Sequence, residues 1–373
     1  MKPIKIAIDI RDLRIAKTGV RTYTQELISE FKKYPSNKFL FVYLDTFLPV
    51  YTGRNKFLKL IEQFRFLIWK QLILPLSAFM QGCDIIFCAD FFVPYFNLGI
   101  ITVPVLHDAF FFEYPQHYNK IWLWLFRTLG ISAAKKAGAI VTPTNYSRQK
   151  IAQLSGLNIE KLVAIYEGPK TLLLNAHDTF FVKLLAGKQY LLHVGVMEKR
   201  KNLTNLLKAF LLLQKTHPHL HLILVGAASP KQDMDDSKNI VAFINDNKLE
   251  GRVILTGYIP DNQLSYFYKN ALMYVFPSLN EGFGIPLIEA FSQHLPVIMA
   301  DNSCLPEVAG DAAITFDPYN TQDIFEKIKL LADNGDLRNE LVTKGNERAK
   351  LFTWQQAAKQ TVALFENLIE KKA

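Results

Sequence analysis

Short apolar runs of strand length recur along this chain, and segments of helix length separate them. Six runs occupy the first half, at residues 4–8, 39–44, 85–87, 101–106, 139–141 and 163–165. Six more follow, at residues 190–194, 220–225, 253–255, 273–276, 297–299 and 313–316. Apolar strands that alternate with helical segments are typical of parallel sheets covered on both faces. The sequence therefore predicts an α/β protein with two doubly wound, Rossmann-like domains.

The two series of strands meet at Glu167-Gly168-Pro169, where glycine and proline supply the turn chemistry of a linker. At 373 residues the chain is long enough for two domains with separate cores. We expect one domain over residues 1–167 and a second over residues 168–352. Residues 353–373 open with the spacing of a capping box and continue with an apolar stripe, which predicts a terminal helix. The stripe consists of Trp354, Ala357, Ala358, Val362, Phe365 and Leu368.

Positive charge is concentrated in the first half of the chain. Residues 1–166 contain 21 Lys and Arg against 11 Asp and Glu, whereas residues 167–373 contain 22 against 23. An anionic partner, such as a phospholipid surface or a lipid pyrophosphate, is one explanation, and a merely soluble basic surface is the other. Basic and aromatic residues are not interleaved as in nucleic-acid modules, so we expect no nucleic-acid partner.

No run approaches the roughly 18 apolar residues of a membrane-spanning helix, and the chain opens directly on a strand pattern. We therefore expect a cytoplasmic protein, with peripheral attachment to the inner face of a membrane as an open alternative. Cys83, Cys88 and Cys304 are odd in number and lack a CxxC spacing. This pattern argues against a zinc site and against a disulfide framework.

Residues 56–74 combine an apolar stripe with the basic residues Lys59, Arg65 and Lys70. Such a stripe is typical of a helix that covers a sheet, so we expect a core helix of the first domain. The alternative is a basic amphipathic helix that lies on an anionic membrane. The apolar positions are Phe57, Leu60, Ile61, Phe64, Leu67, Ile68 and Leu72.

The most specific motif spans residues 281–289 and reads Glu-Gly-Phe-Gly-Ile-Pro-Leu-Ile-Glu, directly after a predicted strand. Proline suits the first turn of a helix, and the two glycines expose backbone N–H groups, so the helix start can bind an anion. Along one helix, eight residues at ~1.5 Å each place Glu281 and Glu289 at most roughly 12 Å apart. That separation suits an elongated ligand, with one acid near a sugar and the other near ribose hydroxyls. The alternative is an ordinary turn with a surface Glu at each end.

A second cluster, at Lys199, Arg200 and Lys201, follows the predicted strand 190–194, and Asn202 can cap the next helix. At the carboxyl end of a parallel strand these cations would face the crevice where such folds bind ligands. Cations there can stabilise a departing pyrophosphate without a metal. Alone, such a run is more often a solvated loop, but its position relative to residues 281–289 favours a diphosphate site.

Two weaker patterns lie in the first domain, and one competing pattern lies in the second. The turn at Thr18-Gly19 is a weak phosphate-loop pattern. His107 ends a strand, where a neutral imidazole can hydrogen-bond a sugar hydroxyl or stabilise a developing cation. Asp233-Met234-Asp235 has the DxD spacing of metal-dependent diphosphate sites, but it lies among acids that suit the start of a helix, so we expect no metal there.

Taken in order, these motifs resemble the family-four retaining glycosyltransferases of the GT-B fold, particularly bacterial mannosyltransferase-like members, over nearly the whole chain. The resemblance implies two Rossmann-like domains facing across a cleft. The N-terminal domain would bind the acceptor, the second domain the nucleotide sugar, and residues 353–373 would cross back to pack on the N-terminal domain. The matching segments are Asp9, Thr18-Gly19, His107-Asp108, Gly195 with Arg200-Lys201-Asn202, Gly257-Tyr258-Ile259-Pro260, Phe276-Pro277-Ser278, residues 281–289, Pro296-Val297, Pro306-Glu307-Val308, Gly310-Asp311-Ala312 and Phe352-Thr353-Trp354.

By this resemblance, Arg200 and Lys201 bind the donor diphosphate, Glu289 holds the ribose, and Glu281 holds the sugar. His107 would lie beside the anomeric carbon, so that His107, Glu281, Arg200 and Lys201 form the catalytic set. A phosphate oxygen would take the acceptor proton, and neither a metal nor another cofactor is implied. The remaining donor-binding positions are Gly19, Gly195, Tyr258, Gly282, Phe283, Gly284 and Ile285. The chain departs from the family pattern at Val196, where many members carry Arg, and at His294, where Gly is common.

The function implied is transfer of a hexose, with mannose from GDP-mannose favoured, to a glycan or lipid-linked acceptor in cell-surface polysaccharide or glycolipid synthesis. Three alternatives stay open. They are a transferase that uses a UDP-sugar to move glucose or N-acetylglucosamine, a GT-B epimerase of UDP-sugars, and a catalytically inactive protein that binds nucleotide sugars.

Overall fold

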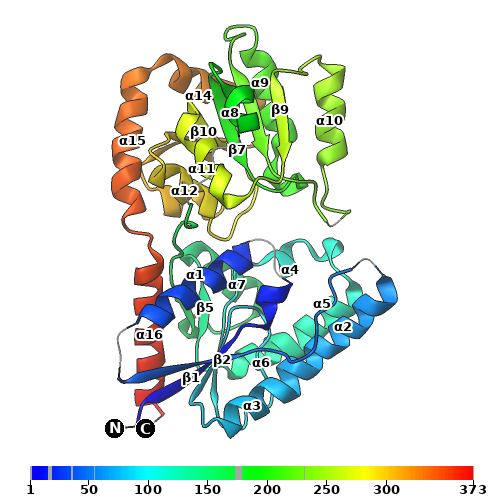
Figure 1. Ribbon diagram of the computed structural model, residues 1–373, viewed down its shortest axis with the longest axis vertical. Helices are drawn as coiled ribbons and strands as arrows, with labels where there is room; N and C mark the ends of the chain where they lie inside the picture. The colour runs from blue at the N-terminus through cyan, green and yellow to red at the C-terminus, as the bar shows by residue number, and fades with distance from the viewer. Residues whose placement is uncertain are drawn as a thin grey trace. The chain divides into compact units, whose positions relative to one another are not determined.

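The structure is a computed structural model that describes residues 2–15, 19–34, 37–53, 55–172, 179–230 and 232–372. The chain forms two compact units (Figure 1). Unit 1 consists of Met1–Glu167 and Trp354–Ala373, and unit 2 consists of Gly168–Thr353. A strand forms at each of the twelve predicted apolar runs, and the paired strands are parallel. The prediction of an α/β fold with parallel sheets is confirmed.

Unit 1 contains a four-stranded sheet in the order β2-β1-β3-β4 and a two-stranded sheet of β5 and β6. The amide of Leu106 donates to Val141 O at 2.8 Å, which joins the chain after β4 to β5. The strands are β1 (Ile4–Asp9), β2 (Phe39–Leu44), β3 (Ile85–Cys88), β4 (Ile101–Pro104), β5 (Ile140–Thr142) and β6 (Leu162–Ala164). The longer helices are α1 (Gly19–Lys33), α2 (Lys56–Ile68), α3 (Leu74–Met80), α7 (Asn145–Ser155) and α16 (Trp354–Glu370). Shorter turns of helix are η1 (Arg11–Arg14), η2 (Trp69–Ile73), α4 (Phe110–Glu113), η3 (Pro115–His117), α5 (Lys120–Leu125), η4 (Phe126–Gly130), α6 (Ile131–Lys136) and η5 (Ile159–Lys161).

The terminal helix α16 is part of the core of unit 1, where it lies beside α1 (Figure 1). The Trp354 ring meets the Tyr23 ring of α1 edge-on, with centroids 5.6 Å apart. Phe365, one turn from the buried Val362, packs its ring against Phe31 and Phe87. The apolar stripe of the terminal segment is therefore buried against the sheet that the first strands form.

Unit 2 contains one six-stranded parallel sheet in the order β12-β11-β10-β7-β8-β9. Its strands are β7 (Tyr190–Val194), β8 (His221–Val225), β9 (Val253–Gly257), β10 (Met273–Phe276), β11 (Val297–Ala300) and β12 (Ala313–Phe316). Its helices are α8 (Thr179–Leu185), η6 (Lys199–Lys201), α9 (Leu203–Leu213), α10 (Ser237–Asp246), α11 (Asp261–Asn270), α12 (Ile285–Ser292), α13 (Leu305–Ala309), α14 (Thr321–Asp333) and α15 (Gly335–Ala349). The strand order reverses between the neighbours β7 and β10. In doubly wound sheets, ligands bind at the carboxyl ends of the strands at such a reversal.

Two local predictions were wrong. The apolar stripe of residues 56–74 does not face the core, because Phe57, Leu60, Phe64 and Leu72 are all exposed. Asn202 occupies the position before α9 with a left-handed backbone, φ 57°, but its side chain donates to Pro318 O and does not cap the helix.

No helix in the described part of the chain is long and apolar enough to cross a membrane. All three cysteines are buried.

Candidate functional site

Two loops bring charged side chains to the central reversal of the unit 2 sheet. The loop after β7 carries η6, which holds Arg200 and Lys201, and the loop after β10 carries Glu281. The backbone fixes one loop to the other, because the amide of Leu279 donates to Arg200 O at 2.7 Å. These neighbouring strands therefore place residues about 80 positions apart in sequence at one point.

Glu281 is the centre of a buried ion cluster. Its Oε1 accepts from Lys201 Nζ at 2.6 Å, and its Oε2 accepts from Arg200 Nη1 at 2.9 Å. The other side of the Arg200 guanidinium is fixed by Glu198, whose Oε2 accepts from Nε at 2.8 Å. The two cations and the two carboxylates balance in charge, and these hydrogen bonds hold both cations in fixed orientations. An incoming phosphate would compete with Glu281 for donors that are already positioned.

The pKa values of the cluster follow from burial opposed by charge. Burial alone would raise the pKa of Glu281, but Arg200 and Lys201 outweigh it and lower the pKa to about 2. Burial lowers the pKa of the Lys201 ammonium, and Glu281 offsets this only in part. Glu281 is therefore ionised throughout the physiological range.

His193, at the end of β7, is a member of the site that the sequence did not single out. Its ring is fully buried, and Nδ1 donates to Val275 O at 3.0 Å. Burial, together with the charge of Lys201, lowers the pKa of His193 to about 4, so the ring is neutral and Nε2 is an acceptor. This buried Nε2 has no hydrogen-bond partner within the described part of unit 2. A Cβ built on Gly195 would lie 3.3 Å from His193 Nε2 and 3.6 Å from Lys201 Nζ, so these two polar atoms flank one glycine.

The glycine pair Gly195 and Gly226 lets the loops after β7 and β8 approach closely. Gly226 has φ 145°, and a Cβ there would lie 1.9 Å from Gly195 O. The amide of Gly195 donates to Val225 O at 2.8 Å, and that of Gly226 donates to Gly257 O at 2.9 Å. Because any side chain at Gly226 would collide with backbone, this glycine sets the path of the loop that leads to Lys201.

Glu289 lies on α12 and is buried. The hydroxyl of Tyr268 donates to Glu289 Oε2 at 2.7 Å. Burial raises the pKa of Glu289 to about 7, although the Tyr268 hydrogen bond opposes this rise. The helix begins only at Ile285, after Gly284 with φ 88°, so Glu281 precedes it and the helical spacing expected between the two acids does not apply. A Cβ on Gly284 would lie 3.0 Å from Leu305, so the tight turn into α12 depends on glycine there.

His107 and Gly19 belong to unit 1. His107 Nε2 donates to Ala89 O at 3.0 Å, and Nδ1 lies 3.4 Å from Glu167 Oε1. Burial would lower the pKa of His107, but the hydrogen bond and charge of Glu167 raise it. Glu167 thus opposes the effect of burial on this ring, and the neutral imidazole expected from the sequence stays a prediction. Gly19 begins α1, and Thr18 lies outside the described residues.

Known proteins share both the sequence pattern and the fold. Residues 177–348 match the family of glycosyl transferases group 1. The O-antigen chain mannosyltransferase B of Escherichia coli is 29% identical over 277 residues, which cover 72% of this chain and 70% of that protein. The O-antigen chain mannosyltransferase RfbU of Salmonella typhimurium is 27% identical over 65% of this chain and 64% of its own length. Sucrose-phosphate synthase from Thermosynechococcus elongatus superposes with a TM-score of 0.75 at 18% identity, over 99% of this chain and 100% of that one. The chain is a GT-B glycosyltransferase.

A further solved structure shares the fold of this glycosyltransferase. Anabaena HepE, in complex with UDP and glucose, superposes with a TM-score of 0.71 at 18% identity, over 98% of this chain and 100% of that one. The matched family region, residues 177–348, contains the ion cluster, His193 and Glu289.

The other positions that the sequence predicts to bind a donor lie near the ion cluster or at the end of the sheet order. Gly282 and Phe283 follow Glu281 directly, and the Phe283 ring meets Phe352 edge-on with centroids 5.7 Å apart. Ile285 is the first residue of α12. Tyr258 follows β9, at the end of the sheet order, and its side chain is exposed.

The DxD segment, Asp233-Met234-Asp235, lies just before α10, and its Asp235 forms hydrogen bonds within the same loop. Asp235 accepts from the amide of Ser229 at 2.9 Å and from the hydroxyl of Ser237 at 2.7 Å. The Ser237 hydrogen bond is the main reason that the pKa of Asp235 is lowered. Its carboxylate thus holds the loop that leads into α10.

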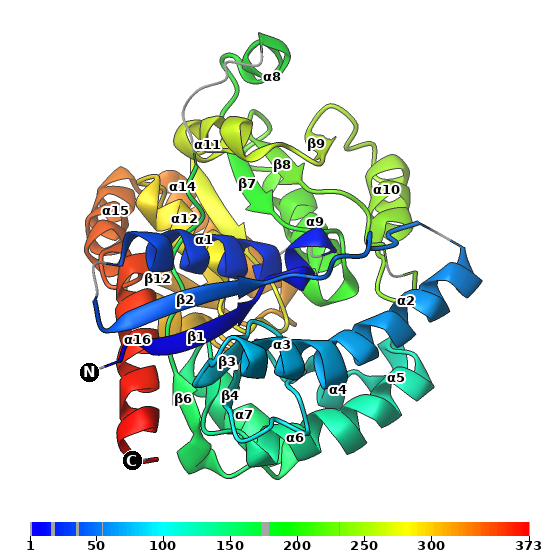
Figure 2. The ribbon, with the colours of Figure 1, turned by 60° about the horizontal axis from the view of Figure 1, so that its bottom comes forward.

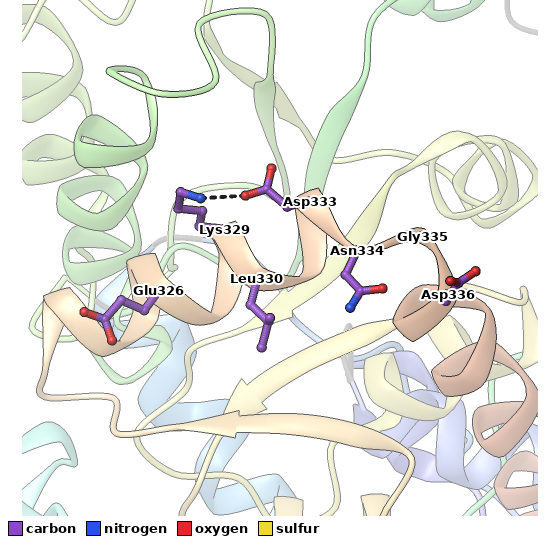
Figure 3. Close-up of a pocket in the computed structure, with 7 residues that line it drawn as sticks. All are labelled: Glu326, Lys329, Leu330, Asp333, Asn334, Gly335 and Asp336. Carbon is purple, nitrogen blue, oxygen red and sulfur yellow. Dashed lines mark hydrogen bonds and ion pairs between the residues drawn. The ribbon is translucent and has the colours of Figure 1, made fainter.

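A surface depression of about 600 Å³ lies at the junction of α14 and α15 (Figure 3). Lys329 and Asp333, one turn apart on α14, form an ion pair of 2.6 Å beside it. No candidate site residue of the glycosyltransferase lines it, so it is separate from the ion cluster. The lining residues are Glu326, Lys329, Leu330, Asp333, Asn334, Gly335 and Asp336.

Proposed function

We propose that the enzyme transfers a hexose from a nucleotide diphosphate sugar to a glycan or lipid-linked acceptor with retention of configuration, and that it needs no divalent metal. The observation that carries this proposal is the buried cluster of Arg200, Lys201 and Glu281 at the strand reversal of unit 2. The strand reversal supports a nucleotide ligand, and the cluster supplies fixed cations for its diphosphate.

In the proposed reaction, the bond between the anomeric carbon and the phosphate oxygen breaks while the acceptor oxygen bonds to the same carbon. The acceptor proton goes to an oxygen of the departing diphosphate. Arg200 and Lys201 stabilise the negative charge that develops on this leaving group, which is the role usually given to a metal ion. The buried Glu289 would accept hydrogen bonds from ribose hydroxyls in its ionised form.

We propose GDP-mannose as the donor and mannose as the sugar that is transferred. Two relatives with long matches to this chain, from Escherichia coli and Salmonella typhimurium, are O-antigen chain mannosyltransferases, which supports mannose and a cell-surface polysaccharide product. We place the donor on unit 2 and the acceptor on unit 1, and we propose His107 and Gly19 as the residues of unit 1 that approach the donor.

The test is incubation of the enzyme with GDP-mannose, UDP-glucose and UDP-N-acetylglucosamine, followed by mass spectrometry with and without EDTA. We expect release of free GDP from GDP-mannose at a rate that EDTA leaves unchanged. An isomeric nucleotide sugar would instead establish an epimerase, and binding without turnover would establish an inactive binding protein. Loss of activity with EDTA and its return with manganese would refute the metal-independent part.

A matched pair of variants tests the site within the same assay. Lys201→Ala removes a buried cation of the cluster, whereas Lys199→Ala removes its exposed neighbour. We expect Lys201→Ala to lower kcat/KM by about 10²-fold or more, as for lost charge stabilisation in the transition state. Lys199→Ala should stay close to the wild type. Equal activity of both variants would remove the site assignment.

A further inference from the structure

Residues 56–80 form one continuous helical segment of unit 1, composed of α2, the π-helical turn η2 and α3 (Figure 1). Large apolar side chains are exposed along its whole length. Seven of them are each between 52% and 78% exposed, far above what a core helix shows. They are Phe57, Leu60, Phe64, Leu72, Leu76, Phe79 and Met80.

The side of this segment that faces the protein carries charge. Glu62 is buried and pairs with the buried Arg11 of η1. Lys70 is 1% exposed and pairs with Asp9 and Asp90, each at 2.6 Å. At 100° per residue, Phe57, Leu60 and Phe64 lie on one side of α2 and Glu62 lies on the opposite side. The buried Glu62 and Lys70 thus face the protein, whereas Phe57, Leu60 and Phe64 face outward.

The neighbouring helix α5 also exposes large apolar side chains. Phe66 of α2 and Trp122 of α5 both contact Phe92, with ring centroids 5.6 and 5.1 Å away, so the two helices lie side by side (Figure 2). On α5, Ile121 and Trp124 are exposed at 66% and 63%. Such side chains on two adjacent helices are not explained by the packing of unit 1.

The charge around these helices identifies the occupant. Residues 46–83 contain five Lys and Arg and a single acid, the buried Glu62; of these cations, Lys70 is buried between Asp9 and Asp90 and Arg65 pairs with Glu62. Residues 114–147 contain four Lys and Arg and no acid. A second copy of this chain would bring the same positive charge to the same face. A phospholipid bilayer with anionic headgroups offers both apolar depth and negative charge.

We propose that the exposed apolar face of residues 57–80 inserts into the interface of an anionic lipid bilayer. Lys59, Lys120 and Arg127, which are exposed beside it, contact the lipid phosphates. Trp124 lies at the headgroup level, where amphipathic rings are favoured. The helix lies in the plane of the interface, because its inner side is fixed to unit 1 by the Arg11–Glu62 and Lys70 ion pairs.

The proposal is tested by co-sedimentation of the full chain with vesicles. Wild type is compared on vesicles of phosphatidylcholine with phosphatidylglycerol and on phosphatidylcholine alone. We expect binding to the anionic vesicles that weakens as salt is raised, and at least tenfold weaker binding to the neutral ones. The measurement needs no catalytic turnover, so it is independent of the proposed function.

Variants separate the apolar and the charged contributions. Phe57→Ser with Phe64→Ser should weaken binding to anionic vesicles about tenfold or more, because both rings leave the bilayer. Leu330→Ser with Leu351→Ser removes two exposed apolar side chains of unit 2 and should bind like the wild type. Changing Lys59, Lys120 and Arg127 to Gln should remove most of the salt dependence. Lys70 and Arg65 are left unchanged, because Lys70 is buried and Arg65 pairs with Glu62.

Three outcomes would overturn the proposal. The first is wild type that pellets no better with anionic than with neutral vesicles. The second is a Phe57→Ser/Phe64→Ser variant that binds like the wild type. The third is a wild type that is dimeric by analytical ultracentrifugation and becomes monomeric in this variant, since the face would then be a contact between copies.

Discussion

The stability of unit 2 should depend on pH through Glu281, and replacing Glu281 by Gln should remove this dependence. Its pKa is about 2 in the folded protein against an ordinary value of 4.5. A shift of this size corresponds to about 3 kcal/mol of stability that the ionised carboxylate provides at neutral pH. Because the folded pKa is depressed, this stability is present above about pH 5 and is lost as the pH falls toward 2.

Glu281→Gln is therefore expected to be about 3 kcal/mol less stable than the wild type at pH 7, and the difference should shrink to about 1–1.5 kcal/mol at pH 3. Urea unfolding of the full chain, followed by circular dichroism, measures this difference. All four tryptophans, Trp69, Trp122, Trp124 and Trp354, belong to unit 1, so tryptophan fluorescence follows that unit separately.

We expect Glu281→Gln to move the circular dichroism transition of unit 2 and to leave the fluorescence transition in place. Glu250→Gln makes the same chemical change at an exposed position of unit 2 and should have no effect within error. A difference between Glu281→Gln and the wild type that is below 1 kcal/mol, or that is equal at pH 3 and pH 7, would refute the ion cluster as the cause.

The other predictions concern a second acid, the histidine of unit 1 and a glycine. Glu289 has its pKa raised to about 7, so its stability contribution is present below 4.5 and is lost as the pH rises through 7. Relative to Glu289→Gln, the wild type should lose up to about 3 kcal/mol between pH 5 and 8 in urea unfolding, and parallel curves would contradict this. His107 also has a raised pKa, so the stability of the wild type should decline above pH 6.5 relative to His107→Gln in thermal unfolding at several pH values. Gly226→Ala should cost about 2–4 kcal/mol, because its Cβ meets Gly195 O, whereas Gly251→Ala, with φ 81° and open space, should cost about 1 kcal/mol. Equal urea midpoints of the two glycine variants would show that the close approach is not rigid.

The strands were predictable because each buried parallel strand is a short apolar run bounded by turns. The twelve runs became β1 to β12, and the order of motifs placed Arg200, Lys201 and Glu281 at strand ends. Their contacts follow from the sheet order, since β7 and β10 are neighbours. The roles of these residues in binding a donor stay predictions.

Helix orientation was not predictable, because an apolar stripe repeats every 3.6 residues whether it faces a core or solvent. The inward side of α2 is decided by Arg11, which lies 51 residues before its partner Glu62. The inward orientation of Lys70 likewise depends on its ion pairs with Asp9, at the end of β1, and Asp90, just after β3. Such pairs depend on tertiary structure and leave no periodic trace in the sequence.

Sequence patterns also could not predict the hydrogen-bond partner or the backbone conformation of a single polar residue. Asn202 is a residue type that often caps helices, and it lies directly before α9. Its side-chain amide nevertheless donates to Pro318 O and does not cap the helix. His294 stands where the family pattern has Gly, and the structure shows why Gly is common there, because φ is 58°. In this chain the backbone of His294 adopts this left-handed conformation. Its Nδ1 lies 2.6 Å from Asn346 Oδ1.

The most direct test of the central claim is a crystal structure of the enzyme with a nucleotide diphosphate sugar bound. The account predicts diphosphate oxygens within hydrogen-bond distance of Arg200 and Lys201, the ribose at Glu289, and no metal ion bridging the phosphates. A donor held elsewhere, or a metal ion that joins the diphosphate to Asp233 and Asp235, would contradict it.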